Sequence, residues 1–557
     1  MLTDTQARQN KRRMLRWALA LSALWAGCIA LVYYWRVFYS YGQYPFAHIP
    51  ALPLTLLLMG LCTVGVCIAF VLCRFVHSFS KQAAAAIFCV GLLFVFVSPP
   101  LQVPDETQHF LRASAISEGH FDFDASRGYA KDTDATVQAF YNAWTNRHDG
   151  SPVKARSATG NVDIAPQDAV KGECITEQFV DYYNITHGTT PLEAARRNTE
   201  PVLFVVLPLL PQALGIALAR LLGFGGLGTL YGARIAALSV YALLCYAALK
   251  NCRRYRALFC AMMLLPLSLY MAASCSYDSM MLGLYFFAAS YFCKDEVTDR
   301  DIVWFALALA LMTSVKLNNI LWLALPLVLP KAAWKTRFKK WQAAVLVLGV
   351  FGALYLGITL FNSVAIRGYG EIGRMIEGAS TAGQLTFMLQ NPLRTLATFW
   401  GTLCENDFFL SKLGLFGNVD TPVAAVNLLS PLVLALSAAL SVHKKSSLSL
   451  RSSLGMLGLA AVYTASNLAG LYVTYTPVGM VRVIGLQARY FLPVYLMLFL
   501  LLAGLLSHVL EPGDEGRGTL RARNLGFGVA VGFGILGALL LFATYFVGPV
   551  AIVPFAA

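Results

Sequence analysis

Fourteen apolar runs, many of them near the length that crosses a bilayer, restrict this chain to a membrane-embedded helical fold. The chain has 557 residues and is 57% hydrophobic but only 13% charged, whereas soluble chains carry about 25% charged residues. Lipid must cover the apolar surface that soluble cores cannot bury. The runs are Leu15–Tyr34, Ala51–Cys73, Ala83–Val97, Pro201–Leu222, Ile235–Leu249, Ala257–Ala273, Met280–Phe292, Ile302–Val315, Ile320–Leu329, Trp341–Leu360, Val423–Val442, Leu454–Val473, Tyr490–Leu506 and Leu525–Val547. The sequence therefore predicts an all-α polytopic membrane protein.

The basic residues predict how these runs are threaded through the membrane. A net charge of +14 would suggest nucleic acid as a partner of a soluble protein, but in a membrane protein basic residues gather in cytoplasmic loops. If Pro201–Leu222 stays on the outer side, the basic loops Lys250–Arg256, Lys331–Lys340 and Lys444–Arg451 all become cytoplasmic. Three prolines and Arg220 within this run also disfavour a straight spanning helix. We therefore expect that it does not cross, and we expect no nucleic-acid partner.

Thirteen spans result, with the N-terminus cytoplasmic and the C-terminus outside. The cytoplasmic segments then carry 24 of the 43 basic residues. A helix-sized stretch at Ala382–Trp400 also stays outside on this count. The expected organisation is residues 1–98 for the first three helices, 99–232 for an extracytoplasmic loop with juxtamembrane helices, 233–360 for helices four to nine, 361–421 for a second extracytoplasmic segment and 422–557 for the last four helices.

The long loop between Ser98 and Glu200 holds 15 of the 29 acidic residues. The pair Pro104-Asp105, with Gln108 three residues later, predicts a helix that runs to about Glu118. Asp105, His109 and Arg112 share one face of that helix, just beyond the third span. Alternatively, Asp105 only caps the helix and Glu106 only complements its dipole.

Three further polar groups are expected at the same membrane face, where charge is costly without a partner or a task. Tyr277 and Asp278 lie in a very short outer turn; alternatively, Asp278 caps a helix beginning near Met280. Lys316 and Asn319 lie at a helix break that suits an anionic head group, with snorkelling of the lysine as the alternative.

Arg489 and Tyr490 open the twelfth span from the outside. Arg489 could bind a phosphate through two hydrogen bonds, with interfacial anchoring as the alternative. Two carboxylate sites and two cationic sites at one leaflet suit a lipid-phosphate donor whose head group is attacked by a nucleophile that needs a base.

These motifs together resemble a bacterial family of multi-span proteins described as a domain of unknown function, which is similar to the C-type (GT-C) glycosyltransferase superfamily. The resemblance rests on Pro-Asp105-Glu106-Thr-Gln-His109-Phe-Leu-Arg112, Ser-Tyr277-Asp278-Ser, the break at Lys316 and Gln-Ala-Arg489-Tyr490-Phe-Leu-Pro, and it covers about residues 83–506. The sequence departs from the superfamily in having two extra spans before the first motif and Ala488 where a glycine is expected.

The resemblance implies a transferase in the bacterial inner membrane that moves a sugar from a polyprenyl-phosphate carrier to an extracytoplasmic glycan or lipid, with inversion. It implies Asp105 as the general base, with Glu106 orienting the acceptor or assisting Asp105. His109 and Arg112 would tune that base. Lys316 and Arg489 would hold the carrier phosphate, and Asp278 would bind donor sugar hydroxyls or a divalent ion. Tyr277, Asn319 and Tyr490 are expected to be further substrate-binding residues.

Cofactor use and the competing functions stay open at this point. We expect no cofactor, although Asp278 could bind a divalent metal, and Asp122-Phe-Asp124 and Asp132-Thr-Asp134 have a metal-type spacing. A glycolipid transporter or flippase would also place charges at a membrane mouth, but usually near the bilayer midplane and with repeats. An O-antigen ligase or polymerase is the other alternative, and would not need an acid pair opening its loop.

Overall fold

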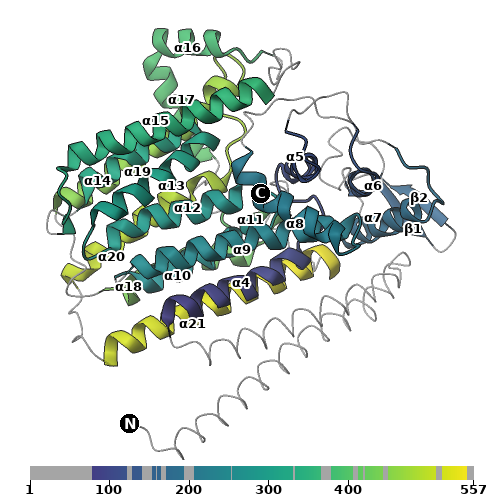
Figure 1. Ribbon diagram of the computed structural model, residues 1–557, viewed down its shortest axis with the longest axis horizontal. Coiled ribbons are helices and arrows are strands. Elements are labelled where there is room, and N and C mark those ends of the chain that lie inside the picture. The colour runs from purple at the N-terminus through teal and green to yellow at the C-terminus, as the bar shows by residue number, and fades with distance from the viewer. Residues whose placement is uncertain are drawn as a thin grey trace, which may run out of the picture.

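A computed structural model describes residues 78–121, 128–140, 153–157, 160–164, 171–193, 206–252, 254–329, 333–365, 378–405, 412–417, 421–442, 450–509 and 517–547. The predicted spans Leu15–Tyr34 and Ala51–Cys73 lie outside these residues. Figure 1 shows a bundle of long helices with a smaller lobe at one end of it. Most of the described chain is helical, as the sequence predicts.

The bundle is built from helices that match the remaining apolar runs. They are α4 (Phe79–Val97), α9 (Leu227–Asn251), α10 (Arg256–Met263), α11 (Pro266–Ala272), α12 (Asp278–Ser290), η5 (Tyr291–Cys293), α13 (Asp299–Val315), η6 (Leu317–Ala324), α14 (Leu325–Val328), α15 (Lys340–Ala365), α18 (Ala424–Leu440), α19 (Leu450–Thr474), η9 (Ala488–Phe491), α20 (Leu492–Val509), α21 (Arg517–Phe542) and η10 (Ala543–Val547). One continuous apolar core joins most of them.

Six segments of the described chain are long and apolar enough to cross a membrane. They are Phe79–Val97, Leu227–Asn251, Lys340–Gly357, Ser452–Thr474, Ala488–Val509 and Leu520–Tyr545. Leu207–Leu221, Asn318–Val328 and Ala424–Leu440 are shorter apolar helices. The prediction of a helical membrane protein is confirmed at this level.

The predicted run Ala257–Ala273 is divided into α10 and α11 at Leu264–Leu265. Pro266 is the first residue of α11, and its missing N–H leaves the preceding turn without a donor. The hydroxyl of Tyr241 donates to the carbonyl of Met263 at 2.8 Å, beside the break. One carbonyl at the break is therefore bonded by a neighbouring helix.

The lobe at one end of the bundle contains the loop that follows α4. Its elements are α5 (Glu106–Ser117), α6 (Lys131–Phe140), the antiparallel strands β1 (Val153–Ser157) and β2 (Gly160–Ile164), and α7 (Lys171–Thr186). These strands, and the two-residue pair β3 (Leu415–Phe416) and β4 (Thr421–Pro422), were not predicted. Helix α5 follows the prediction closely, because it begins after Asp105 and ends one residue before Glu118.

The run Pro201–Leu222 forms η4 (Leu207–Leu209) and α8 (Leu210–Leu221) in its described part. The 12 residues of α8 would extend only about 18 Å, which is too short for a bilayer. Helix α8 folds back along the start of α9, where Gly215 and Gly232 pack backbone against backbone. Arg234, in the same part of α9, donates to the carbonyl of Ser98 at the end of α4, 2.6 Å away.

Helices α4 and α9 therefore meet at one end of the bundle, and the chain between them returns to the side from which it left. The expectation that Pro201–Leu222 does not cross the membrane stays a prediction. From Arg234 to Asn251, α9 extends about 26 Å, close to the thickness of the hydrocarbon core.

The expected helix at Ala382–Trp400 is instead two helices, α16 (Thr381–Gln390) and α17 (Pro392–Glu405), beside each other at the top of Figure 1. Pro392 begins α17, and a residue before proline disfavours helical geometry, which ends α16. Both helices expose large apolar side chains: Leu385, Leu389, Leu393, Leu396 and Trp400.

Candidate functional site

Three segments that are far apart in the sequence meet at the end of the bundle that carries the lobe. Arg489 lies at their centre, with its side chain only 6% exposed. It donates from Nη2 to Asp105 at 2.6 Å and from Nη1 to Asp278 at 3.0 Å. It also contacts the carbonyl of Pro104, at 3.3 Å. One guanidinium thus joins the start of α5, the start of α12 and η9.

Asp105 does not cap α5 with its side chain. It occupies the position before the helix, but no capping hydrogen bond forms, and its backbone is left-handed with φ of 62°. A non-glycine residue in this region costs about 1 kcal/mol or more and persists where other contacts fix it. Here the carboxylate is held by Arg489 while its side chain stays 45% exposed. Asp105 is therefore a fixed carboxylate that solvent or an acceptor can reach.

Asp278 is the first residue of α12, so it begins the helix rather than preceding it. Its side chain is 10% exposed and is paired with Arg489. Its backbone N–H bonds to the hydroxyl of Ser276 at 3.2 Å, which fixes the turn. The capping alternative does not describe this carboxylate, because it accepts from the guanidinium of Arg489.

Lys316 follows the last residue of α13, at the break before η6. Its ammonium lies 4.1 Å from the centroid of the Tyr490 ring and 6.0 Å from that of Tyr277. Within the described part of the chain, no carboxylate lies within ion-pair distance of it. Two aromatic faces hold this cation, which leaves its charge available to an anionic ligand.

A pocket opens beside these charges, within the helices of the bundle. It holds about 350 Å³ of space, part of it open to solvent. Its lining comes from η9, α12, α19 and the α13–η6 break: Asp278, Met281, Leu282, Tyr285, Lys316, Tyr463, Asn467, Arg489 and Tyr490. The Nε of Arg489 is buried and has no hydrogen-bond partner among the described residues. This lining combines charged groups with apolar and aromatic side chains, which suits an amphipathic ligand.

His109 lies on α5, one turn after Asp105, and is 3% exposed. Its ring packs edge-on against Tyr277, with centroids 4.4 Å apart, and its Nδ1 has no hydrogen-bond partner in the described part of the chain. Burial, and secondarily the nearby charge of Arg112, lower the pKa of His109 to about 3, although Asp105 opposes the shift. Burial also raises the pKa of Tyr277, and the charge of Asp278 adds to this. Both rings are therefore neutral at physiological pH.

We expect His109 to make the protein less stable in acid. Because its pKa is lower in the folded state than in the unfolded state, its contribution is complete above about pH 6.5 and is lost as the pH falls towards 3. Between pH 6.5 and pH 5 the loss is about 2 kcal/mol. Thermal unfolding in detergent should show a smaller fall in Tm for His109→Gln than for the wild type over this range. His120→Gln, at an exposed histidine of the lobe, should keep the wild-type slope; equal slopes for all three proteins would exclude His109 as the cause.

Glu106 lies apart from the other site residues in a buried ion pair that the sequence did not predict. Its Oε2 accepts from Nη2 of Arg234 at 2.6 Å, and both side chains are fully buried. Its Oε1 accepts from Nε of Arg234 and from the backbone N–H of Cys275, each at 2.8 Å. The carboxylate that was expected to assist Asp105 thus links the start of α5 to α9 and to the turn before Asp278.

Arg234 uses all five of its N–H donors. Besides Glu106, it donates to the carbonyls of Val95, Ser98 and Pro99 at 2.9, 2.6 and 2.9 Å. It therefore satisfies the carbonyls at the end of α4, which helical hydrogen bonds leave free. The sequence signal that could have indicated a buried partner is a single arginine at the edge of an apolar run, where an unpaired charge is costly.

Asn319 is also fully buried and does not line the pocket. Its Oδ1 accepts from the hydroxyls of Tyr285 and Tyr463 at 2.7 and 2.8 Å, and its Nδ2 donates to the carbonyl of Met312. This side chain, which was expected to bind substrate, instead fixes the break after α13. Asn467, which reasoning from sequence missed, lines the pocket in its place.

Arg112 is partly buried on α5 and close enough to affect the pKa of His109. The metal-type pairs lie elsewhere: Asp122 and Asp124 fall outside the described residues, and Asp132 is bound by Arg220 at 3.1 Å. Among the described residues, no three His, Cys, Asp or Glu side chains are placed to hold a metal ion.

The comparison with family models gives one match. A model described as a predicted membrane protein, DUF2142, matches residues 88–498, which include Asp105, Asp278, Lys316 and Arg489. No curated protein and no solved structure matches the chain.

Proposed function

We propose that this chain, which belongs to the DUF2142 family of predicted membrane proteins, is an integral-membrane glycosyltransferase. It would move a sugar from a polyprenyl-phosphate carrier to a hydroxyl of an extracytoplasmic glycan or lipid. The proposal includes the finer topology: thirteen spans of GT-C type in a bacterial inner membrane, the N-terminus cytoplasmic and the site on the outer face.

One arrangement carries this proposal: Arg489 holds a fixed, exposed carboxylate, and the pocket that Arg489 lines also holds a lysine with no ion pair among the described residues. Asp105 is 45% exposed, and the ammonium of Lys316 lies at the pocket against Tyr490. The transfer removes a proton from the acceptor hydroxyl and releases the carrier phosphate from the donor sugar. It therefore needs a base at one point and a cation at another.

In the proposed step, the acceptor oxygen attacks the anomeric carbon of the donor from the side opposite the phosphate. Asp105 takes the hydroxyl proton as the new carbon–oxygen bond forms. The bond between the anomeric carbon and the phosphate oxygen breaks, and its electron pair stays with the carrier phosphate. The configuration at the anomeric carbon is inverted, and no covalent intermediate with the protein forms.

The binding roles differ from the first expectation for Arg489. Its charge is shared by two carboxylates, so we assign it to positioning Asp105 and Asp278 rather than to the phosphate. Lys316 becomes the principal phosphate ligand, and the apolar side of the pocket, at Met281 and Leu282, would take the first isoprene units. The second oxygen of Asp278 would accept from a sugar hydroxyl.

Lys316→Gln should lower kcat/KM for the polyprenyl-phosphate donor by about 10²-fold, since it removes the charge that stabilises the leaving phosphate. KM for the acceptor should change little. Steady-state transfer with purified protein in detergent measures both constants. Lys131→Gln, an exposed lysine of the lobe, is the matched control. An unchanged kcat/KM for the donor in Lys316→Gln would remove Lys316 from the site.

A further inference from the structure

The helices α16 and α17, here called the α16–α17 pair, bury polar side chains against the rest of the protein. In the described part of α17 the buried residues are all threonines: Thr395, Thr398 and Thr402. The buried residue of α16 is Gln384. A helix at the surface of a soluble protein buries its apolar stripe and exposes its polar one. The α16–α17 pair has the opposite arrangement.

The exposed side of the α16–α17 pair is a patch of large apolar side chains. Leu389 and Leu393, on either side of the turn between the helices, are 83% and 80% exposed. Leu393, Leu396 and Trp400 follow one another at helical spacing, so they form one stripe along α17. Patches of this kind mark surfaces that contact protein or membrane.

Polar groups of the pair bond to its own backbone. The exposed Thr386 donates its hydroxyl proton to the carbonyl four residues earlier, at 2.9 Å, and Thr395 and Thr402 do the same at 3.0 and 2.7 Å. In the turn, the N–H of Asn391 also donates to the carbonyl four residues earlier, at 2.8 Å, while Pro392 has no N–H. Lipid offers no hydrogen bonds, so internal bonding of this kind favours hydrocarbon as the medium around the pair.

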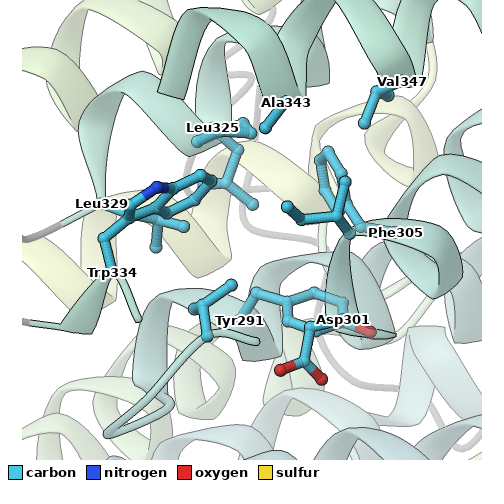
Figure 2. A pocket seen from close by; sticks show the side chains of 11 residues that line it. Tyr291, Asp301, Phe305, Leu325, Leu329, Trp334, Ala343 and Val347 are labelled. Atoms are coloured by element: carbon cyan, nitrogen blue, oxygen red, sulfur yellow. The ribbon is translucent and has the colours of Figure 1, made fainter. Parts of the chain in front are cut away.

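The helices of the bundle do not show this polar packing where α13, α14 and α15 meet. Figure 2 shows Phe305, Leu325, Leu329 and Val347 around the space between them, while the carboxylate of Asp301 points away. The inner contacts there are apolar. Polar inner contacts are therefore a local property of the α16–α17 pair.

The polar side of the pair holds the segment that leads to the candidate site. The side-chain oxygen of Gln384 accepts from the N–H of Gly479 at 3.0 Å, and the hydroxyl of Thr402 accepts from the N–H of Val483 at 3.0 Å. Both donors lie between α19 and η9, and Arg489 follows Val483 by six residues. The α16–α17 pair is therefore fixed at the end of the bundle that carries the site.

The apolar patch is continuous with the surface of a helix that can cross the membrane. Helix α16 packs against α19, whose residues Ser452–Thr474 are long and apolar enough to span, and Figure 1 shows the pair beside the bundle. Val462 on α19 is exposed, as are Val478 and Val481 in the segment that the pair holds. The same solvent, lipid, therefore reaches from α19 to the α16–α17 pair.

Neither helix of the pair can cross the bilayer by itself. The 10 residues of α16 extend about 15 Å and the 14 residues of α17 about 21 Å, whereas the hydrocarbon core is about 30 Å thick. Amphipathic helices of this length lie in one leaflet, with the apolar face at the boundary of head groups and acyl chains.

We propose that the α16–α17 pair is inserted into the lipid leaflet on the side of the candidate site. Its exposed side chains would contact acyl chains: Leu385, Leu389, Leu393, Leu396 and Trp400. Arg394, whose guanidinium lies 5.5 Å from the centroid of the Phe387 ring, would extend to the head-group phosphates. The pair thus lies in lipid instead of in the water outside the membrane.

Fluorescence quenching of the full chain in liposomes tests this. Leu389→Cys and Leu393→Cys are made singly, with Cys404→Ser to remove the exposed thiol of α17, and each is labelled with an environment-sensitive fluorophore. The same chain without an introduced cysteine gives the background. Doxyl-labelled lipid should quench both labels several-fold more than aqueous iodide does. A doxyl group near the top of the acyl chain should quench more than one near its end, because the expected depth is about 5–10 Å.

Two control positions set the limits of the measurement. Lys131→Cys, at an exposed position of the lobe, should be quenched by iodide, and Val462→Cys, in the middle of α19, should be quenched most by the doxyl group at the chain end. Because Leu389 and Leu393 are so exposed, replacing either removes little packing, and each position tests the proposal separately.

Three results overturn the proposal. Stronger quenching by iodide than by lipid would place the pair in water. Protection from both quenchers would show that protein covers the patch, either a second copy or another part of this chain. Strongest quenching by the doxyl group at the chain end would place the pair at the bilayer centre.

Discussion

Asp105→Asn should reduce sugar transfer by about 10²–10⁴-fold, the usual contribution of a general base, and leave the fold intact. Asparagine tolerates the left-handed backbone that φ of 62° requires at this position. Arg489 keeps its bonds to Asp278 and to the carbonyl of Pro104. The substitution therefore removes the proton acceptor with little other change.

The loss should appear in kcat, with Tm within a few degrees of that of the wild type. Glu118→Gln, at the end of the same helix, is the matched control for the change from carboxylate to amide and should keep kcat. Asp105→Glu should recover part of the activity, since it restores the base at a shifted position. Full activity in Asp105→Asn would mean that another group accepts the proton.

Glu106→Gln should act on stability instead. It leaves the guanidinium of Arg234 without its counter-charge in a fully buried position, and breaking a buried pair in this way costs about 3–5 kcal/mol. Arg234→Gln should be at least as damaging, because three carbonyls at the end of α4 also lose their donor. Tm in detergent and the yield of monodisperse protein measure both effects.

The double variant Glu106→Gln/Arg234→Gln should cost less than the sum of the two single variants, because neither charge is then left alone. The specific activity of the Glu106→Gln protein that does fold should be close to normal. A stable Glu106→Gln protein without activity would instead restore Glu106 to the assisting role that the sequence suggested.

Much of the site could be predicted from sequence, because a charged side chain near a bilayer is costly unless it has a partner or a function. Asp105, Asp278, Lys316 and Arg489 were selected partly on that cost. In the fold, the guanidinium of Arg489 pairs with both carboxylates, and the ammonium of Lys316 lies over the ring of the neighbouring Tyr490. The limits of α5 were also predictable, since a proline–acid start and a glycine after its end are local signals.

The parts that sequence did not predict depend on contacts between distant elements. Arg234 stands at the edge of an apolar run, and nothing local shows that its partner is Glu106, 128 residues earlier. Asn319 and Lys316 are near neighbours, yet one is turned into a tyrosine network and the other towards the pocket. The direction of each side chain depends on how far the backbone rotates at the break between the two helices. The sequence of a short break does not determine that rotation.

Transfer by the wild-type protein in liposomes tests the central claim most directly. The donor carries a labelled sugar on polyprenyl phosphate, and envelope glycans and lipids are offered as acceptors on the side of α5. We predict that label leaves the carrier for an acceptor with inversion at the anomeric carbon, and that Asp105→Asn blocks this. Label that stays on the carrier with every acceptor, while the carrier itself is moved across the bilayer, would contradict a transferase and indicate a flippase.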